Sequence, residues 1–269
     1  MALTDLQRRI CRLLAERRVA HGESYVAGGA ALQTLLGADL VSRDIDVFAD
    51  SAEAVREASS GDLADLARAK LAVEVLVERT GFVEALVSDA TGSARVEWAA
   101  DSAYRFFPLM THPDLGLTLH PIDAATNKAL ALVGRSEPRD WVDLIECHRR
   151  LQPLGYLIWA AVGKDPGLSP AFVLDQAART ARYTEADLEH LQFGGVRPTA
   201  ADLSCTFRAA LAQARAIVAL LPPDSLGQCV LTAAGAPAHW SDDELPAMLP
   251  QLRFHSGALH GAFPSVKPA

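Results

Sequence analysis

Two short stretches near the start of the chain decide its fold: residues 26–32 read Val-Ala-Gly-Gly-Ala-Ala-Leu, and residues 44–48 read Asp-Ile-Asp-Val-Phe. They predict a strand, a glycine turn, a short helix and a second strand. Because side chains alternate along a strand, Asp44 and Asp46 should share one face, about 7 Å apart, while the apolar residues between them enter a core. The pattern therefore predicts two paired carboxylates at a sheet.

The glycine pair adds a second chemical feature. Gly28 and Gly29 permit a tight turn and a close approach of the backbone, so a helix beginning near Ala30 would offer its N–H groups and dipole to a phosphate. Two neighbouring carboxylates repel each other unless a cation lies between them, and their oxygens suit a divalent metal. A metal site beside a phosphate cradle indicates nucleotide chemistry.

These residues carry a resemblance to a known family. The Gly-Gly-x-Ala-Leu motif at residues 28–32, followed by Ser-Arg-Asp-Ile-Asp-Val-Phe at 42–48, resembles the signature of the polymerase-β-like nucleotidyltransferase superfamily. Within it, the chain is most similar to the AbiEii/AbiGii toxin family. Residues 123–132 and 134–144 resemble that family's lysine helix and its Arg-Asp-x-x-Asp helix. Where the family often has Ser or Thr after the second glycine, this chain has Ala30.

The resemblance implies an α/β (α+β) fold, with a small mixed sheet flanked by helices. Residues 1–120 would form the nucleotidyltransferase catalytic core, and residues 121–269 a mainly helical C-terminal region that completes the nucleotide site. From the residues themselves we expect helices, strands and a hairpin over these ranges: helix 4–18, strand 24–27, helix 30–36, strand 44–48, two helical pieces within 51–80, a hairpin of strands 82–88 and 94–99, and helices 121–133 and 136–150.

The resemblance also implies a metal site. Asp44 and Asp46 would bind Mg²⁺ or Mn²⁺, and Glu97 on a neighbouring strand would be the third carboxylate. Asp101 is the fallback for that third position. A solvent-facing strand glutamate remains an equally good interpretation of Glu97.

The downstream helices contribute further candidates. Lys128 and Arg135 are seven residues apart, nearly two helical turns, so both cations could approach a triphosphate. Asp140 would position Lys128 or contact the nucleotide, whereas Asp143 could simply orient an arginine. A surface lysine would look the same by itself. The predicted nucleotide-binding set is Gly28, Gly29, Ala30, Arg43, Lys128 and Arg135, and the predicted catalytic set is Asp44, Asp46, Glu97, Lys128 and Asp140.

Composition and charge indicate which other classes of protein the sequence does not fit. Half of the 269 residues are hydrophobic and 22% are charged, as in an ordinary soluble protein, and no stretch is apolar enough for a membrane span. The N-terminus lacks a signal-peptide layout, so we expect a cytoplasmic protein. The four cysteines form no Cys-x-x-Cys pair, which argues against zinc. A net charge of −8 weighs against a broad nucleic-acid surface. The arginines near residues 8–18 and 135–150 are best interpreted as solvated helix faces, with a local basic patch as the alternative.

The function expected from these features is metal-dependent transfer of a nucleoside monophosphate from a nucleoside triphosphate to an acceptor hydroxyl. The family resemblance makes RNA, in particular tRNA, the first acceptor to consider, and implies toxin-like action with a cognate antitoxin protein as partner. A small-molecule hydroxyl, as in antibiotic-modifying relatives, is the second acceptor. A non-catalytic nucleotide-binding or partner-binding module of the same fold is the alternative of a different class.

Overall fold

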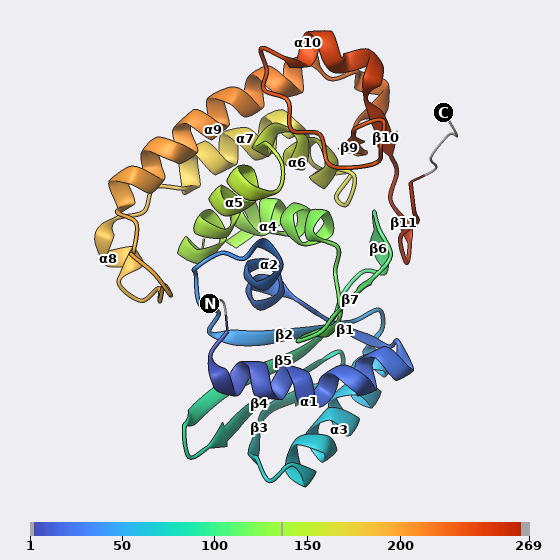
Figure 1. Cartoon of the computed structure of the whole chain (residues 1–269), viewed down its shortest axis with the longest axis vertical. Coiled ribbons are helices and arrows are strands. Elements are labelled where there is room, and N and C mark those ends of the chain that lie inside the picture. The colour runs from blue at the N-terminus through green and yellow to red at the C-terminus, as the bar shows by residue number, and fades with distance from the viewer. Residues whose placement is uncertain (1–2, 136, 265–269) are drawn as a thin grey trace. The chain divides into compact units, whose positions relative to one another are not determined.

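The structure is a computed structural model that describes residues 3–135 and 137–264. Ser136, which belongs to the motif at residues 134–144, therefore lies outside the described residues. The chain forms two compact units, one of Met1–Ala103 with Pro108–His120, and the other of Tyr104–Phe107 with Pro121–Ala269 (Figure 1).

A seven-stranded sheet organises the first unit, in the order β3-β4-β5-β2-β1-β8-β7. Strand β2 pairs in parallel with β5, and β1 in parallel with β8, while the other neighbours are antiparallel. The expected mixed α/β class is therefore confirmed. The strands are β1 Ser24–Ala27, β2 Asp44–Ala49, β3 Ala72–Arg79, β4 Phe82–Asp89, β5 Gly92–Ala100, β7 Met110–His112 and β8 Gly116–Thr118.

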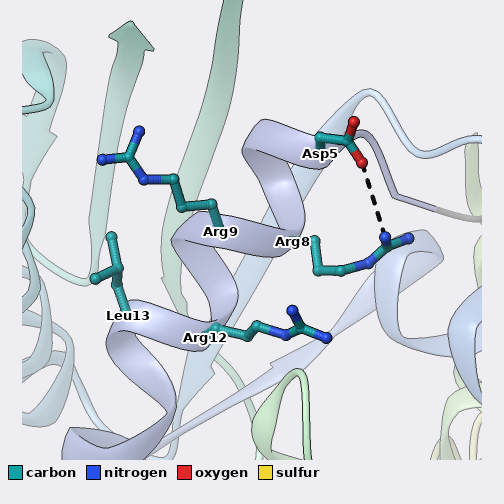
Figure 2. Close-up of a pocket in the computed structure, with 5 residues that line it drawn as sticks. All are labelled: Asp5, Arg8, Arg9, Arg12 and Leu13. Carbon is teal, nitrogen blue, oxygen red and sulfur yellow. Dashed lines mark ion pairs between the residues drawn. The ribbon is translucent and has the colours of Figure 1, made fainter.

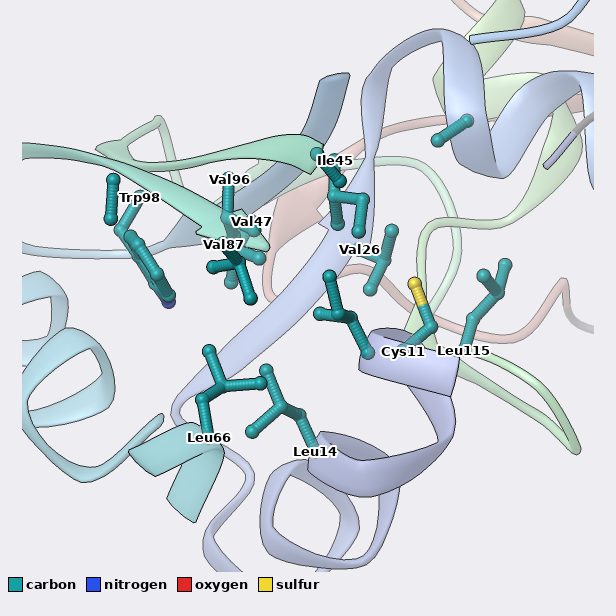
Figure 3. Packing of buried hydrophobic residues seen from close by; sticks show 14 of the residues in the cluster. Cys11, Leu14, Val26, Ile45, Val47, Leu66, Val87, Val96, Trp98 and Leu115 are labelled. Carbon is teal, nitrogen blue, oxygen red and sulfur yellow. The ribbon is translucent and has the colours of Figure 1, made fainter. Parts of the chain in front are cut away.

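Three helices pack on this sheet: α1 Asp5–His21, α2 Gly28–Leu36 and α3 Ala52–Arg68. Thr4 begins α1 with a capping box that Gln7 completes. Leu14 of α1 and Leu66 of α3 lie in one apolar cluster with buried strand residues such as Trp98, as Figure 3 shows. Burial of these large side chains is the main stabilising contribution to the unit.

The expectation of helix throughout residues 51–80 was wrong in two ways. Helix α3 runs through Gly61 without a break. The glycine serves a close contact, since a Cβ there would lie 2.0 Å from the Arg17 guanidinium. Residues 72–79 form strand β3, paired along its length with β4. Alternating β-branched residues favour a strand there, and pairing with the hairpin outweighs the helix propensity of the alanines and leucines before it.

The second unit is mainly helical, as expected. Helix α4 continues one residue past the predicted stop at Gly134, and α5 ends at Arg150 as predicted. Its elements are α4 Pro121–Arg135, α5 Pro138–Arg150, α6 Leu154–Ala161, α7 Pro170–Thr180, α8 Glu185–Leu188, α9 Ala200–Leu220 and α10 Leu245–Met248, with 3-10 turns Pro223–Ser225 and Leu249–Gln251 and strands β6 Tyr104–Arg105, β9 Cys229–Leu231, β10 Arg253–His255 and β11 Ala258–Leu259.

Asp123 explains why the short segment 104–107 belongs to the second unit. Its buried carboxylate accepts hydrogen bonds from the backbone N–H groups of Phe106 (2.8 Å) and Phe107 (3.0 Å). The same carboxylate pairs with Lys164 at 2.9 Å, so a buried charge is both paired and hydrogen-bonded.

Helix α9 is an exception to the expectation that no stretch of the chain is apolar enough to span a membrane. By length and composition alone it qualifies, with a mean hydropathy of 1.2 over an 18-residue window. One face of the helix, including Leu203, Phe207 and Ile217, is buried within the unit, where α9 packs on α6. A core-packing role accounts for this apolar face.

Candidate active site

Strand β2 presents the two aspartates as the sequence predicts. Burial alternates along the strand: Ile45 and Val47 are buried, whereas Asp44 and Asp46 are partly exposed. Both carboxylates therefore lie on the face opposite the apolar core of the unit, which confirms the predicted orientation.

The glycine turn lies directly against the second aspartate. Gly28 has φ +62°, and a Cβ at this position would come within 1.8 Å of Asp46 Oδ2. Only glycine combines that backbone conformation with that approach. Helix α2 begins at Gly28, two residues earlier than predicted, and Ala27 before it supplies no side-chain cap. The Asp46 carboxylate thus lies at the positive end of the helix, where anions are stabilised.

Glu97 lies directly across from Asp46 in the β2–β5 register. In-register residues of parallel strands point to the same face, so this register brings together the three carboxylates that the sequence nominated. Burial, together with the charges of Asp46, Asp44 and Glu84, raises the pKa of Glu97 above its ordinary value. The fallback, Asp101, lies beyond the end of β5, and its carboxylate accepts a hydrogen bond from the Ser102 N–H at 2.8 Å.

Two residues of this face were missed by sequence reasoning. Glu84 of β4 lies opposite Glu97, and Arg95 of β5 lies opposite Asp44. The Arg95 guanidinium contacts Glu84 at 2.9 Å and Asp44 at 3.8 Å. The hairpin itself carried the signal, since Ala90 and Thr91 at its turn fix which residues of the two strands face each other.

The donor set suits a magnesium-like ion. Within residues 3–135 and 137–264, no three His, Cys, Asp or Glu side chains come close enough to hold a metal by themselves. Mg²⁺ is commonly bound by one or two carboxylates, with water and substrate phosphate completing its shell. Asp44 and Asp46 are both partly exposed and fit that mode; Asp46 lies beside the start of α2, and Glu97 lies opposite Asp46.

Ala30 and Arg43 are placed differently from the other predicted nucleotide-binding residues. Ala30 is fully buried in the apolar cluster, so only its backbone N–H suits a phosphate. Arg43 is exposed in the loop before β2, and its backbone carbonyl accepts a hydrogen bond from Gln7 Nε2 at 3.2 Å.

In the second unit, Lys128 is the centre of a charge network. Its Nζ lies 2.6 Å from Asp140 and 2.8 Å from Asp143, and only 7% of its side chain is exposed. Arg135 donates to both oxygens of Asp140, at 2.7 and 3.0 Å, with 58% of its side chain exposed. The sequence nominated Lys128, Arg135 and Asp140, and the structure brings them together; the pairing of Asp143 with Lys128 was not predicted.

The pKa values of the network follow from these contacts. Burial works to lower the pKa of Lys128, but the charges of Asp143 and Asp140 outweigh it and raise the value. Burial works to raise the pKa of Asp140, but hydrogen bonds from Arg135 and Lys128 lower it. Lys128 and Asp140 are therefore both charged near neutral pH, and direct phosphate contact by Lys128 would require its ammonium to leave a carboxylate.

The arginines of α1 are engaged within the first unit. A hollow of about 460 Å³ is lined by Arg8, Arg9 and Arg12 together with Asp5 and Leu13. Figure 2 shows that all five side chains come from α1. Arg9 pairs with Asp89 at 2.9 Å and Arg12 with Asp114 at 2.6 Å. These pairs agree with the interpretation as a solvated helix face.

Arg18 departs from that interpretation because its side chain is fully buried beside Asp62, whose carboxylate also accepts a hydrogen bond from Trp98 at 2.9 Å. This arginine therefore belongs to the interior of the first unit.

Comparisons with known proteins are sparse. No family model and no curated protein matches the chain, so the AbiEii/AbiGii resemblance stays a prediction. A solved chain described as "putative nucleotidyltransferase from H. pylori" is similar to it at 14% identity and a TM-score of 0.49, covering 78% of this chain and 95% of that one.

Proposed function

We propose that the chain is a metal-dependent nucleotidyltransferase that moves a nucleoside monophosphate from a nucleoside triphosphate to an acceptor hydroxyl. The observation that carries the proposal is the placement of Asp46: its carboxylate shares a face of β2 with Asp44 and lies against Gly28 at the start of α2. A metal position and a phosphate position thus adjoin each other.

The residues of the first unit would act as follows. Asp44 and Asp46 hold Mg²⁺ or Mn²⁺, which when bound polarises the α-phosphate and lowers the pKa of the attacking hydroxyl. The first-turn N–H groups of α2 bind the triphosphate. Glu97 takes the proton from the acceptor hydroxyl or helps to hold the cation. The acceptor oxygen forms a bond to the α-phosphorus, the bond from that phosphorus to the bridging oxygen breaks, and pyrophosphate leaves.

In the second unit we assign phosphate contact to Arg135, because its guanidinium is the exposed member of the network. Asp140 orients that guanidinium through two hydrogen bonds, and Lys128 neutralises Asp140 from the buried side. Lys128 is then a positioning residue in this proposal, whereas the sequence predicted direct phosphate contact.

RNA remains the first acceptor to test, because the family resemblance implies it. Toxin-like action, a cognate antitoxin and a cytoplasmic location belong to the same proposal and rest on the sequence alone.

A small hydroxyl compound, neutral or cationic, is the second candidate acceptor. It is favoured by the face that carries the aspartates, since Glu84 and Glu97 add two more carboxylates beside them. A phosphate-rich acceptor would be repelled by such a face.

The experiment is transfer of label from each α-labelled nucleoside triphosphate, with Mg²⁺, to total RNA or to a panel of aminoglycosides. Asp46→Asn keeps the side-chain volume against Gly28 and should abolish transfer, whereas Glu53→Gln, at a glutamate whose side chain is 76% exposed on α3, should leave it unchanged. Label in RNA or in a small molecule identifies the acceptor. Equal transfer by Asp46→Asn would overturn the assignment, and nucleotide binding without transfer would favour the non-catalytic module.

A further inference from the structure

Arg95 places a positive charge inside the proposed metal site. It lies in register with Asp44 on the neighbouring strand, and its guanidinium spans Asp44 at 3.8 Å and Glu84 at 2.9 Å. About half of the Arg95 side chain is exposed, so the guanidinium is not fixed by packing. The arginine therefore has two carboxylate partners, of which one is a proposed metal ligand.

The surrounding charges explain why an arginine is needed there. Glu84, Glu97 and Asp46 lie side by side across three strands, and like charges opposite each other destabilise a sheet. A guanidinium offsets part of that repulsion when no metal is present. A divalent cation at Asp44 would compete with the same guanidinium for the same oxygen atoms.

We propose that Arg95 is a positioning residue that occupies Asp44 until a divalent cation binds, and that Glu84 then holds its guanidinium away from the metal. The inference rests on the proposed function, because it assumes that Asp44 is a metal ligand. It predicts opposite effects of the two partners: loss of Arg95 removes a competitor for the metal, whereas loss of Glu84 leaves the guanidinium to Asp44 alone.

The test measures the dissociation constant of Mn²⁺ by electron paramagnetic resonance on the full chain without nucleotide. Arg95→Gln should tighten binding about two- to fivefold, and Glu84→Gln should weaken it by a similar factor, which are the sizes expected for half-exposed ion pairs. Arg56→Gln is the matched control, since it removes the same charge from a side chain that is 72% exposed on α3, and it should leave the constant unchanged. Thermal unfolding without metal verifies that each variant is folded.

The double variant distinguishes positioning of Arg95 by Glu84 from a direct electrostatic effect of each charge on the bound cation. If Glu84 acts by holding Arg95, Glu84→Gln should have almost no effect on Mn²⁺ affinity when Arg95→Gln is already present. Additive effects of the two changes, or a wild-type constant in Arg95→Gln, would overturn the inference and leave the proposed function standing. Absence of Mn²⁺ binding by the wild-type chain without nucleotide would overturn the inference alone, because in the proposed function the substrate phosphates complete the shell of the metal.

Discussion

The two charged clusters of this protein differ in burial and in balance. On the sheet, Asp44, Asp46 and Glu97 are partly exposed, and their carboxylates outnumber the nearby guanidinium. Between α4 and α5, Lys128 is buried and paired with two aspartates, one of which also binds Arg135. The first cluster has unbalanced negative charge that an added cation can neutralise, whereas the second is neutralised by the chain itself.

This difference predicts that the two clusters respond differently to substitution. A buried, paired lysine is costly to disturb, because removal of one partner leaves an uncompensated charge in the interior. A partly exposed surplus of carboxylates costs less to keep, because water screens the repulsion. Changes in the two clusters should therefore have different sizes and even different signs.

The largest effect is expected for Lys128→Met. It leaves Asp140 and Asp143 buried without the ammonium, so the free energy of unfolding should fall by about 3–5 kcal/mol. Urea unfolding measures the change. Lys70→Met, at an exposed lysine, is the control and should stay within about 0.5 kcal/mol of the wild type. A loss under 1 kcal/mol for Lys128→Met would show that the network is not a stabilising unit.

A smaller loss is expected for Gly28→Ala. The new Cβ would meet Asp46 Oδ2, and the residue would keep φ +62°, so we expect a cost of about 1–3 kcal/mol and weaker Mn²⁺ binding. Gly37→Ala, at the other end of the same helix, has φ +60° with nothing within 4 Å of the Cβ and reports backbone strain alone. Equal losses in unfolding energy and equal Mn²⁺ affinity in the two variants would contradict a role for the Gly28–Asp46 contact.

The pH dependence of the unfolding free energy should show the contribution of the Lys128 network. Because the folded-state pKa of Asp140 is lowered, its contribution is present above the unfolded-state pKa and is lost as pH falls through the folded-state value. The pKa of Lys128 is raised, so its contribution is lost only as pH rises through that raised value. Asp140→Asn should flatten the acid limb of a plot of unfolding free energy against pH by about 1 kcal/mol. An unchanged acid limb would mean that other carboxylates produce it.

The smallest effect, of opposite sign, is expected for Glu97→Gln. Burial and neighbouring carboxylates raise the pKa of Glu97, so its charged form is disfavoured in the fold and the neutral amide should stabilise the metal-free protein by up to about 1 kcal/mol at pH 7. The gain should vanish as pH falls below the ordinary glutamate pKa, where the wild-type group is protonated in both states. Thermal unfolding at pH 7 and pH 4 checks this, and destabilisation at pH 7 would contradict the assignment.

Much of the first unit follows from local pattern. Alternation places Asp44 and Asp46 on one face of β2, and the hairpin turn fixes β4 against β5. Strand β3 was not predicted because the residues just before it favour a helix. Its strand conformation depends on pairing with β4, which comes later in the sequence. The burial of Arg18 was not predicted, because it depends on the packing of Asp62 of α3 against this arginine of α1.

The sequence by itself determined that Asp44 and Asp46 share a face, that Gly28 and Gly29 form a turn, and that Lys128 and Arg135 lie nearly two turns apart, because each depends on the local pattern of one strand, turn or helix. The tertiary structure alone decided that Glu97 faces Asp46, that Arg95 faces Asp44, and that Lys128 is buried between two aspartates. These contacts join separate elements, and their register and burial arise only when the elements pack together.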